Sequence, residues 1–110
     1  MSATSIDRVR ELNDSFRSSF VGGAVMLTAA VEALEADTKR RLLERVRTFD
    51  KFEKGNDSYR EHDFGAVEIE GDRFLFKIDY YDRACKFASP DPANPAVTTR
   101  ILTVMHSAEY

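Results

Sequence analysis

The stretch FKIDYYDRACKFASPDPANPAVTTRILTVM, residues 76–105, decides the fold of this 110-residue chain. The apolar runs at its two ends are rich in β-branched and aromatic residues, which predicts a strand at each end. Between them, residues 89–95 hold all three prolines of the chain. Because proline has no N–H for a strand ladder, this segment is expected to be a stiff loop. The stretch therefore predicts two strands joined by an irregular connection.

Alternation within the two strands predicts which side chains share a face. One face of the first strand takes large apolar or aromatic residues: Phe74, Phe76, Ile78 and Tyr80. The other face takes Leu75, Lys77, Asp79 and Tyr81. The second strand has apolar residues on both faces, with Leu102 and Val104 on one and Ile101 and Met105 on the other. Such a strand is typically central or covered on both sides.

A third strand precedes these two. Val67 and Ile69 alternate with Glu68 and Glu70, which indicates a half-buried strand. The pair Gly71-Asp72 suits a tight turn, so this strand and the next are expected to form a hairpin.

The first half of the chain is expected to supply two helices. Apolar residues recur every three or four positions over residues 5–19, and the glycine pair 22–23 ends that helix. Residues 25–28 suggest a short strand, although residues 24–50 also suit one long helix; residues 36–50 are helical in either case. The order α-β-α-β-β-β predicts an α+β fold, two helices on a small antiparallel sheet, as a single domain over residues 1–110.

Composition narrows the class of protein. With 43% hydrophobic residues, the chain can form one modest core, and a homodimer would bury further surface. The single cysteine, Cys85, excludes an intramolecular disulfide and fits a reducing cytosol. There is no apolar run of about 18 residues and no signal-peptide pattern at the N-terminus, so we expect a cytoplasmic protein with no membrane partner.

Charge is unevenly placed. Residues 38–54 hold seven basic and three acidic residues, whereas residues 61–82 hold seven acidic and two basic residues. The basic helix offers phosphate contacts through four residues, which raises the alternative of a nucleic-acid-binding protein: Arg40, Arg41, Arg45 and Arg47. The net charge of −3 and the lack of a helix-turn-helix or zinc motif argue against nucleic acid as the direct ligand.

Catalytic and cofactor motifs are missing from the sequence. The tripeptide Asp63-Phe64-Gly65 matches a kinase motif by accident, since the other kinase motifs are lacking. His62 and Asp63, combined with Asp79, raise the alternative of a small metal-dependent enzyme. With two histidines and no cysteine partner, a capped turn with a solvated histidine is the better interpretation. We therefore expect no catalytic residues, no metal and no cofactor.

The best candidate surface for a protein partner is the run Asp79-Tyr80-Tyr81-Asp82. Tyrosine buries a large area while keeping a polar tip, so it is favoured at binding hot spots. Alternation in the strand implies that one tyrosine faces the core and only the other faces outward. The hairpin adds three carboxylates to the candidate surface: Glu68, Glu70 and Asp72.

These residues resemble a family of small bacterial proteins classed only as a domain of unknown function, common on alphaproteobacterial plasmids and other mobile elements. The resemblance lies in residues 62–65, 76–82, 89–92 and 99–105, and it extends over roughly residues 5–110. The chain departs from the family pattern at Ala30, where glycine is usual. Because family members lie among anti-restriction and other anti-defence genes, the resemblance implies an accessory role in the entry of mobile DNA.

The sequence and the resemblance together predict a non-enzymatic inhibitor of a bacterial defence system, of the anti-CRISPR or anti-restriction type. It would bind a nucleic-acid-handling defence protein through the acidic hairpin and the tyrosine run. The metal-dependent enzyme and the nucleic-acid-binding accessory protein remain as alternatives.

Overall fold

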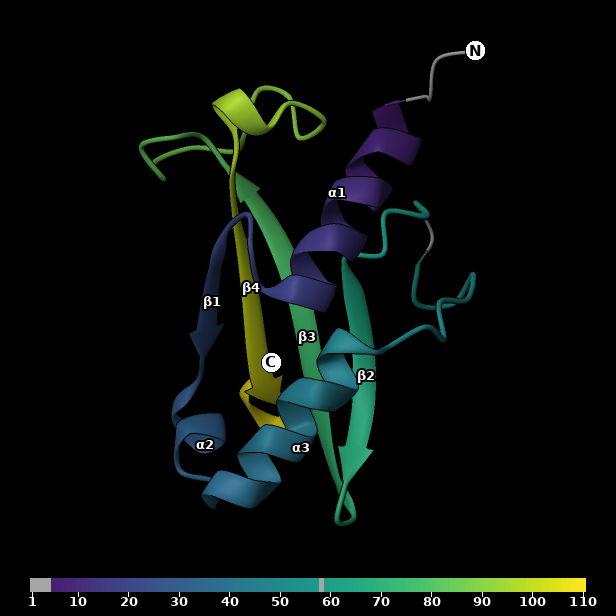
Figure 1. Ribbon diagram of the computed structural model, residues 1–110, viewed down its shortest axis with the longest axis vertical. Helices are drawn as coiled ribbons and strands as arrows, with labels where there is room; N and C mark the ends of the chain where they lie inside the picture. Colours follow the sequence, from purple (N-terminus) through teal and green to yellow (C-terminus); the bar gives the residue numbers. More distant parts are fainter. Residues whose placement is uncertain (1–4, 58) are drawn as a thin grey trace.

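A four-stranded sheet organises the chain, and the computed structural model describes residues 5–57 and 59–110 of it (Figure 1). The elements in chain order are α1 (Ser5–Ser19), β1 (Ala24–Leu27), α2 (Ala29–Glu32), α3 (Ala36–Arg47), β2 (Phe64–Ile69), β3 (Asp72–Tyr81), η1 (Pro95–Val97), β4 (Thr99–His106) and η2 (Ser107–Glu109). The predicted α+β class is confirmed. In the described ranges, no helix has both the length and the apolar character needed to cross a membrane.

The strands lie in the order β1-β4-β3-β2, and the sheet is mixed. Strand β3 is antiparallel to β2 and to β4, as predicted, but β1 pairs with β4 in the parallel direction. The expectation of a wholly antiparallel sheet is therefore wrong at β1. The cause is the connection through α3 and the loop that follows it, which returns the chain toward the end where β1 began, so that β2 runs in the same direction as β1 (Figure 1). Because β3 is antiparallel to both β2 and β4, β4 also runs in the direction of β1.

Residues 24–34 form a strand followed by a short helix, so the alternative of one long helix is wrong. Val25 lies opposite Leu102 and Leu27 lies opposite Val104 in the ladder with β4. Both side chains pack against the core. Pairing with a central strand thus holds residues 24–27 in a strand, while the alanine-rich segment that follows forms the short helix α2. Helix α3 begins at Ala36 as predicted and ends at Arg47, three residues earlier than expected.

The β2–β3 hairpin turns one residue earlier than predicted. Its central residues are Glu70 and Gly71, with φ angles of 54° and 84°, and Ile69 pairs with Asp72 across the turn. Two successive positive φ angles are the mark of a type I′ turn, whose twist matches that of the flanking strands. Glycine suits the second of these positions, so Asp72 begins β3 and is not part of the turn.

The core lies between the sheet and the helices α1 and α3. Phe76 of β3 and Leu102 of β4 are fully buried, and they share this cluster with Phe16 of α1 and with Leu42 and Val46 of α3. Leu42 and Val46, four residues apart, form the buried stripe of α3. Strand β4 is central, as its sequence predicts, because it lies between β1 and β3.

Gly65 allows the aromatic part of this core to close. A Cβ placed there would overlap the Phe76 ring and would lie 2.8 Å from Cε1 of Phe49. The Phe49 and Phe76 rings meet edge to face with centroids 5.2 Å apart. The substitution Gly65→Ala should therefore lower the free energy of unfolding by about 1–3 kcal/mol, because it overpacks a filled core.

Gly55→Ala is the matched control, since a Cβ at Gly55 meets nothing within 4 Å. It should change the free energy of unfolding by less than about 0.5 kcal/mol in the same urea denaturation experiment. Equal stability of the two variants would show that the Gly65 contacts are not as close as described.

Candidate functional site: the open face of the sheet

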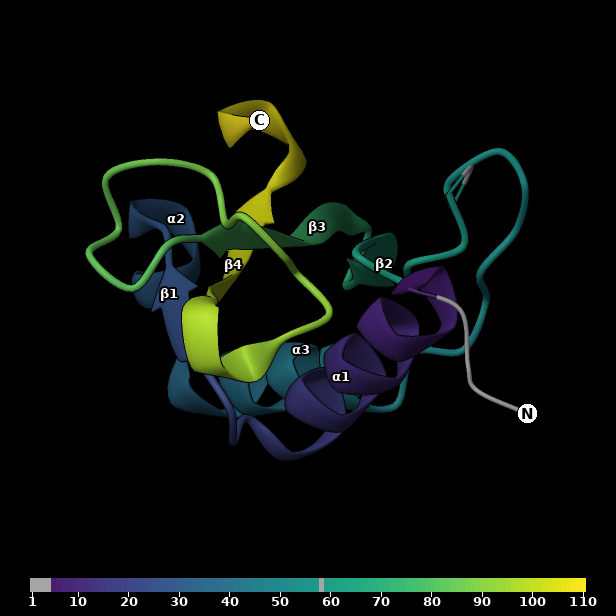
Figure 2. The ribbon, with the colours of Figure 1, turned by 90° about the horizontal axis from the view of Figure 1, so that it is seen from above.

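Helices α1 and α3 cover one face of the sheet (Figure 2). Over the opposite face, here called the open face, residues 5–57 and 59–110 place no helix other than the short η2 at one end. Every second residue of each strand contributes to the open face. By the register of the sheet, its central members are Met26, Phe64, Lys77, Asp79, Tyr81, Ile101, Thr103 and Met105. The face is closed at one end by η2 and bordered at the other by the loop after β3.

A groove of about 540 Å³ crosses the open face. Met26, whose exposed fraction is 54%, and Ile101 supply its apolar surface, while Tyr81 and Cys85 line the end nearest the loop. Lys77 and Asp79 also line it, and their ion pair spans 2.8 Å between Nζ and Oδ2. The groove thus combines exposed apolar and aromatic side chains with one ion pair.

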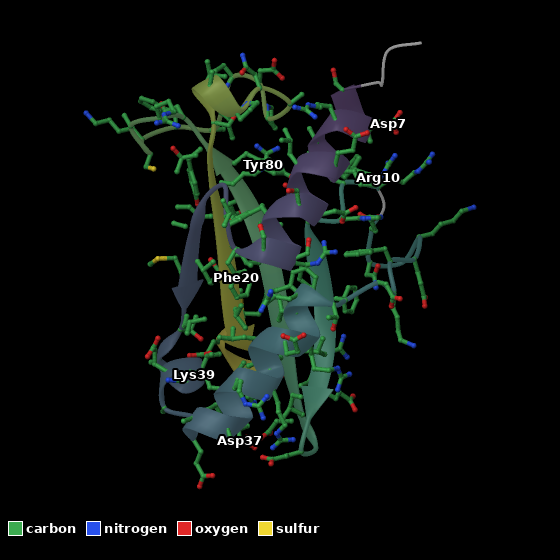
Figure 3. The ribbon with its side chains drawn as sticks, viewed as in Figure 1. Asp7, Arg10, Phe20, Asp37, Lys39 and Tyr80 are labelled. Atoms are coloured by element: carbon green, nitrogen blue, oxygen red, sulfur yellow. The ribbon has the colours of Figure 1, made fainter. Side chains whose placement is uncertain are left out.

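The two adjacent tyrosines lie on opposite faces, which confirms the alternation predicted from the sequence. Tyr81 lines the open-face groove. Tyr80 points from β3 toward α1 and packs against the core (Figure 3). Burial raises the pKa of the Tyr80 hydroxyl well above its usual range. Tyr80 is therefore placed away from the surface that a partner of the open face would meet.

A buried polar network holds Tyr80. Its hydroxyl accepts a hydrogen bond from Asn13 Nδ2 at 2.7 Å and donates to Glu61 Oε1 at 3.0 Å. Arg100 donates through Nε to Asn13 Oδ1 at 2.9 Å, and its guanidinium lies 5.2 Å from the centre of the Tyr80 ring. Asn13 is fully buried, and its Nδ2 also donates a hydrogen bond to the Glu61 carbonyl at 2.9 Å. The network ties α1 to the ends of β3 and β4.

Sequence reasoning missed this network, although two signals for it exist. Asn13 stands four residues after Val9 and three before Phe16, within the apolar stripe of the first helix. Arg100 lies two residues before Leu102 and therefore on the same core face of β4. A polar residue in a buried stripe requires a partner, because an unpaired buried polar group is costly. The identity of that partner depends on tertiary contacts.

The loop after β3 is braced close to Tyr81. The Asp82 N–H donates to the Phe87 carbonyl at 2.8 Å, and Asp82 Oδ1 accepts from the Lys86 N–H at 2.9 Å. The Ser89 N–H donates to the Tyr80 carbonyl at 3.1 Å. Asp82 thus shapes the loop that borders the groove, and Asp79 and Asp82 lie near Tyr81 as the sequence predicts.

The acidic hairpin lies at the far end of β3 from this cluster. Asp72 and Tyr81 are nine positions apart on the same strand, so the distance between them is about 30 Å. The hairpin lies beside the basic helix α3, and Arg41 Nη2 contacts Glu70 Oε1 at 2.5 Å. Asp72 Oδ1 lies 3.4 Å from Nε2 of His106, and Glu68 is exposed. The structure therefore separates Glu68, Glu70 and Asp72 from the tyrosine end of the sheet.

Each arginine proposed for nucleic-acid contact takes part in an internal contact. Arg40 pairs with Asp37 at 2.7 Å, and Arg41 bridges Asp37 and Glu70. Arg45 donates to the Glu68 carbonyl at 3.3 Å, while Arg47 donates to the Ser18 carbonyl at 3.0 Å. The Arg41–Glu70 pair thus joins the basic segment of the sequence to the acidic segment at the surface of the folded chain.

The proposed metal ligands His62, Asp63 and Asp79 lie in different surroundings. His62 stacks on the Phe52 ring at 3.9 Å, with Nδ1 2.8 Å from Asp14 Oδ1 and Nε2 3.5 Å from Asp57 Oδ2. Burial raises the pKa of the Asp63 carboxyl, whereas Asp79 lies on the open face with Lys77. In residues 5–57 and 59–110, no group of three or more histidine, cysteine, aspartate or glutamate side chains is arranged to hold a metal ion.

The C-terminal turn closes one end of the open face through Glu109. Its Oε1 accepts hydrogen bonds from Thr28 Oγ1 at 2.6 Å and from the His106 N–H at 2.8 Å, while Oε2 accepts from the Ala30 N–H at 3.1 Å. These three bonds lower the pKa of the Glu109 carboxyl below its ordinary value of 4.5. Tyr110 then packs edge to face on Phe64, with ring centroids 6.0 Å apart.

Comparison with known proteins gives one match. A family model described as "Protein of unknown function (DUF3768)" matches residues 27–109, which is 83 of the 110 residues. The matched range begins at Leu27, the last residue of β1. It contains Glu109 and the groove-lining residues other than Met26, and it leaves out α1. The resemblance to an uncharacterised domain family, noted from the sequence, is thereby confirmed. No curated protein and no solved structure matches the chain.

Loss of the Tyr80 hydroxyl tests the buried network. Tyr80→Phe should lower the free energy of unfolding by about 1–2 kcal/mol, because one Asn13 donor would remain buried without its acceptor. Tyr81→Phe, the same change on the open face, should stay within about 0.5 kcal/mol of the wild type. Urea denaturation followed by circular dichroism measures both, and equal losses would argue against the network.

The hydrogen bonds of the Glu109 carboxylate predict that the stability of the C-terminal turn depends on pH. Because its folded-state pKa lies below the unfolded value, its stabilising effect is present above the ordinary pKa and is lost as the pH falls through the folded-state pKa. Glu109→Gln should therefore destabilise the protein at pH 7 more than at pH 3. An NMR titration of the Ala30 and His106 amides should give a midpoint below 4.5 in the wild type. A midpoint above 4.5 would contradict these hydrogen bonds.

Proposed function

We propose that this chain, which belongs to the DUF3768 family, is a non-enzymatic inhibitor that binds a bacterial defence protein through its open sheet face. The observation that supports the proposal is the groove on that face, with Met26, Tyr81 and Ile101 around the Lys77–Asp79 ion pair. The partner we propose is a nucleic-acid-handling protein, either a restriction enzyme or a CRISPR effector, and the place of action is the cytoplasm.

The make-up of the groove favours a protein partner over a small substrate. Protein interfaces are enriched in tyrosine and methionine at their centres and have a polar rim. Tyr81 and the exposed Met26 are side chains of the kind found at interface centres, and the Lys77–Asp79 pair and Asp82 supply polar groups beside them. The groove lies on the exposed face of the sheet, where another folded surface can reach it.

Tyr81 is the residue we expect to contribute most to binding. Tyrosine is a frequent hot spot because a large rigid ring is buried at a small cost in side-chain entropy. The backbone of Tyr81 is held by eight-residue pairing of β3 with β4 and by the network around the adjacent Tyr80. A side chain held in this way is organised before the partner arrives.

Charge supports a partner with a basic surface. Asp79 and Asp82 lie close to Tyr81, and proteins that handle nucleic acid present lysine and arginine along their binding grooves. Complementary charge speeds association and selects against acidic partners. The choice of a defence protein among such partners rests on the family resemblance to proteins carried by mobile elements.

The triple change Asp79→Ala, Tyr81→Ala and Asp82→Ala tests the surface. A host with an active restriction or CRISPR system is transformed with a targeted plasmid while it expresses the chain. Wild-type protein should raise the transformation efficiency, and the triple variant should lose that protection because the hot spot and its flanking charges are gone. Circular dichroism of the purified variant checks that the fold survives.

The matched control changes exposed residues on the helix side, Arg40→Ala and Glu44→Ala, and should protect as well as the wild type. Full protection by the triple variant would exclude the open face as the binding surface. Failure of the wild type to protect against every restriction and CRISPR system tried would overturn the inhibitor proposal itself.

A further inference from the structure

We infer that the outer edge of β2 is a strand-addition site, at which an extended acidic segment of a partner protein pairs with Phe64, Ala66 and Glu68. This site is separate from the open face, because it uses backbone groups at the rim of the sheet and the space beside α3. The inference does not depend on the proposed inhibitory function.

The phase of the β2–β3 ladder decides which backbone groups face outward. The Ile78 N–H donates to the Asp63 carbonyl at 2.8 Å, and these two residues are register partners one step beyond Phe64 and Lys77. In an antiparallel pair, hydrogen-bonded and non-hydrogen-bonded positions alternate. Gly65 and Val67 therefore bond to β3, whereas Phe64, Ala66 and Glu68 direct their N–H and C=O groups away from the sheet.

Strand β2 stands at the outer position of the sheet, beside the end of α3 (Figure 1). A hollow of about 380 Å³ lies over this edge, between the strand and the last turn of α3. It is lined from the helix side by Arg45, Thr48 and Phe49, from the following loop by Asp50 and Lys51, and from the sheet by Ala66, Val67, Glu68 and Arg73. A groove between an edge strand and a helix is the arrangement in which peptide-binding domains add a strand.

One outward-facing backbone group, the Glu68 carbonyl, already accepts a hydrogen bond. The Glu68 carbonyl takes a hydrogen bond from Arg45 Nη1 at 3.3 Å, so a side chain occupies the place of a neighbouring strand at that point. Ala66, half-buried in the middle of the edge, carries the smallest side chain that keeps a Cβ. A backbone that approaches here would place its N–H and C=O groups opposite those of Ala66, and at Glu68 it would take the place of Arg45.

The charges around the hollow select the partner segment. Arg45, Lys51 and Arg73 line it, against the carboxylates of Asp50 and Glu68. In an added antiparallel strand, residues opposite Val67 would place their side chains toward α3, near Arg45 and Lys51, while residues beside Glu68 would lie near Arg73. Because three basic side chains line the hollow against two carboxylates, acidic side chains at these positions would gain more favourable charge pairs than lysine would.

The other edge of the sheet is less suited to this role. Strand β1 has four residues against six in β2, and a short edge strand is one of the usual means of preventing unwanted pairing. In the parallel pairing with β4, Val25 and Leu27 are the residues whose backbone N–H and C=O groups face away from the sheet. Their side chains pack against the core. The longer edge with basic side chains around it is β2.

The substitution Ala66→Pro tests the edge directly. It removes an N–H that points away from β3, so the native ladder keeps its bonds, and proline is tolerated on edge strands in this orientation. The probe is a fluorescein-labelled peptide of alternating valine and glutamate, measured by fluorescence anisotropy at low salt. Wild-type protein should bind it, and Ala66→Pro should weaken binding by about tenfold or more through the lost bond and the blocked approach. Ala66→Ser, which keeps the N–H, should bind like the wild type.

Charge preference is tested with a second peptide, in which lysine replaces glutamate. The wild type should bind the glutamate peptide about tenfold more tightly, and the double variant Lys51→Glu with Arg73→Glu should reverse that order. This variant leaves the backbone edge intact, so the test holds even if Ala66→Pro fails to fold. In hydrogen exchange by NMR, the glutamate peptide should slow the amides of Phe64, Ala66 and Glu68.

Several outcomes would overturn the inference: no binding of either peptide, binding that Ala66→Pro leaves unchanged, or equal binding of both peptides. A wild-type dimer in light scattering that Ala66→Pro dissociates would assign the edge to a second copy of this chain and would also overturn it. Tyr81→Ala should leave peptide binding unchanged. That variant separates the two proposals, because it removes an open-face residue and leaves the β2 edge intact.

Discussion

The antiparallel pairing of β3 with β4 is the constraint on which the rest of the molecule depends. It joins eight residue pairs, from Phe74 opposite His106 to Tyr81 opposite Thr99. Because side chains alternate along each strand, this single register decides what each face of the sheet contains. Phe76 and Leu102 fall on the face that α1 and α3 cover, and Tyr81 and Ile101 fall on the open face. A slip of one residue would exchange the core with the groove.

The pairing of charges within the fold changes the meaning of the charge pattern. The sequence has a basic segment and an acidic segment, which suggests two faces of opposite sign. In the structure α3 and the β2–β3 hairpin lie side by side, and Arg41 contacts Glu70. Such exposed pairs contribute little to stability, but they lower the potential that either segment presents to a partner. Asp82 and the Lys77-paired Asp79 lie beside Tyr81, and Arg45, Lys51 and Arg73 lie around the β2 edge.

One small sheet can therefore offer two kinds of contact. The open face presents side chains, and a partner there would be chosen by shape, aromatic packing and charge. The β2 edge presents backbone groups, and a partner there would be chosen first by its ability to become a strand. The open face exists because helices α1 and α3 lie on the same side of the sheet, and the β2 edge exists because β2 is the last strand of the sheet, with α3 beside it.

Local pattern in the sequence determined the first helix, the hairpin, the central position of β4 and the division of Tyr80 from Tyr81. These features depend on periodicities of two and 3.6 residues, which neighbouring positions define. Tertiary structure alone decided the parallel direction of β1, the contact of Asn13 with Tyr80 and the distance between the hairpin and Tyr81. Asn13 and Tyr80 are 67 residues apart in the sequence. Their meeting depends on how α1 packs across the sheet, and packing of that kind is a property of the whole chain that no local pattern encodes.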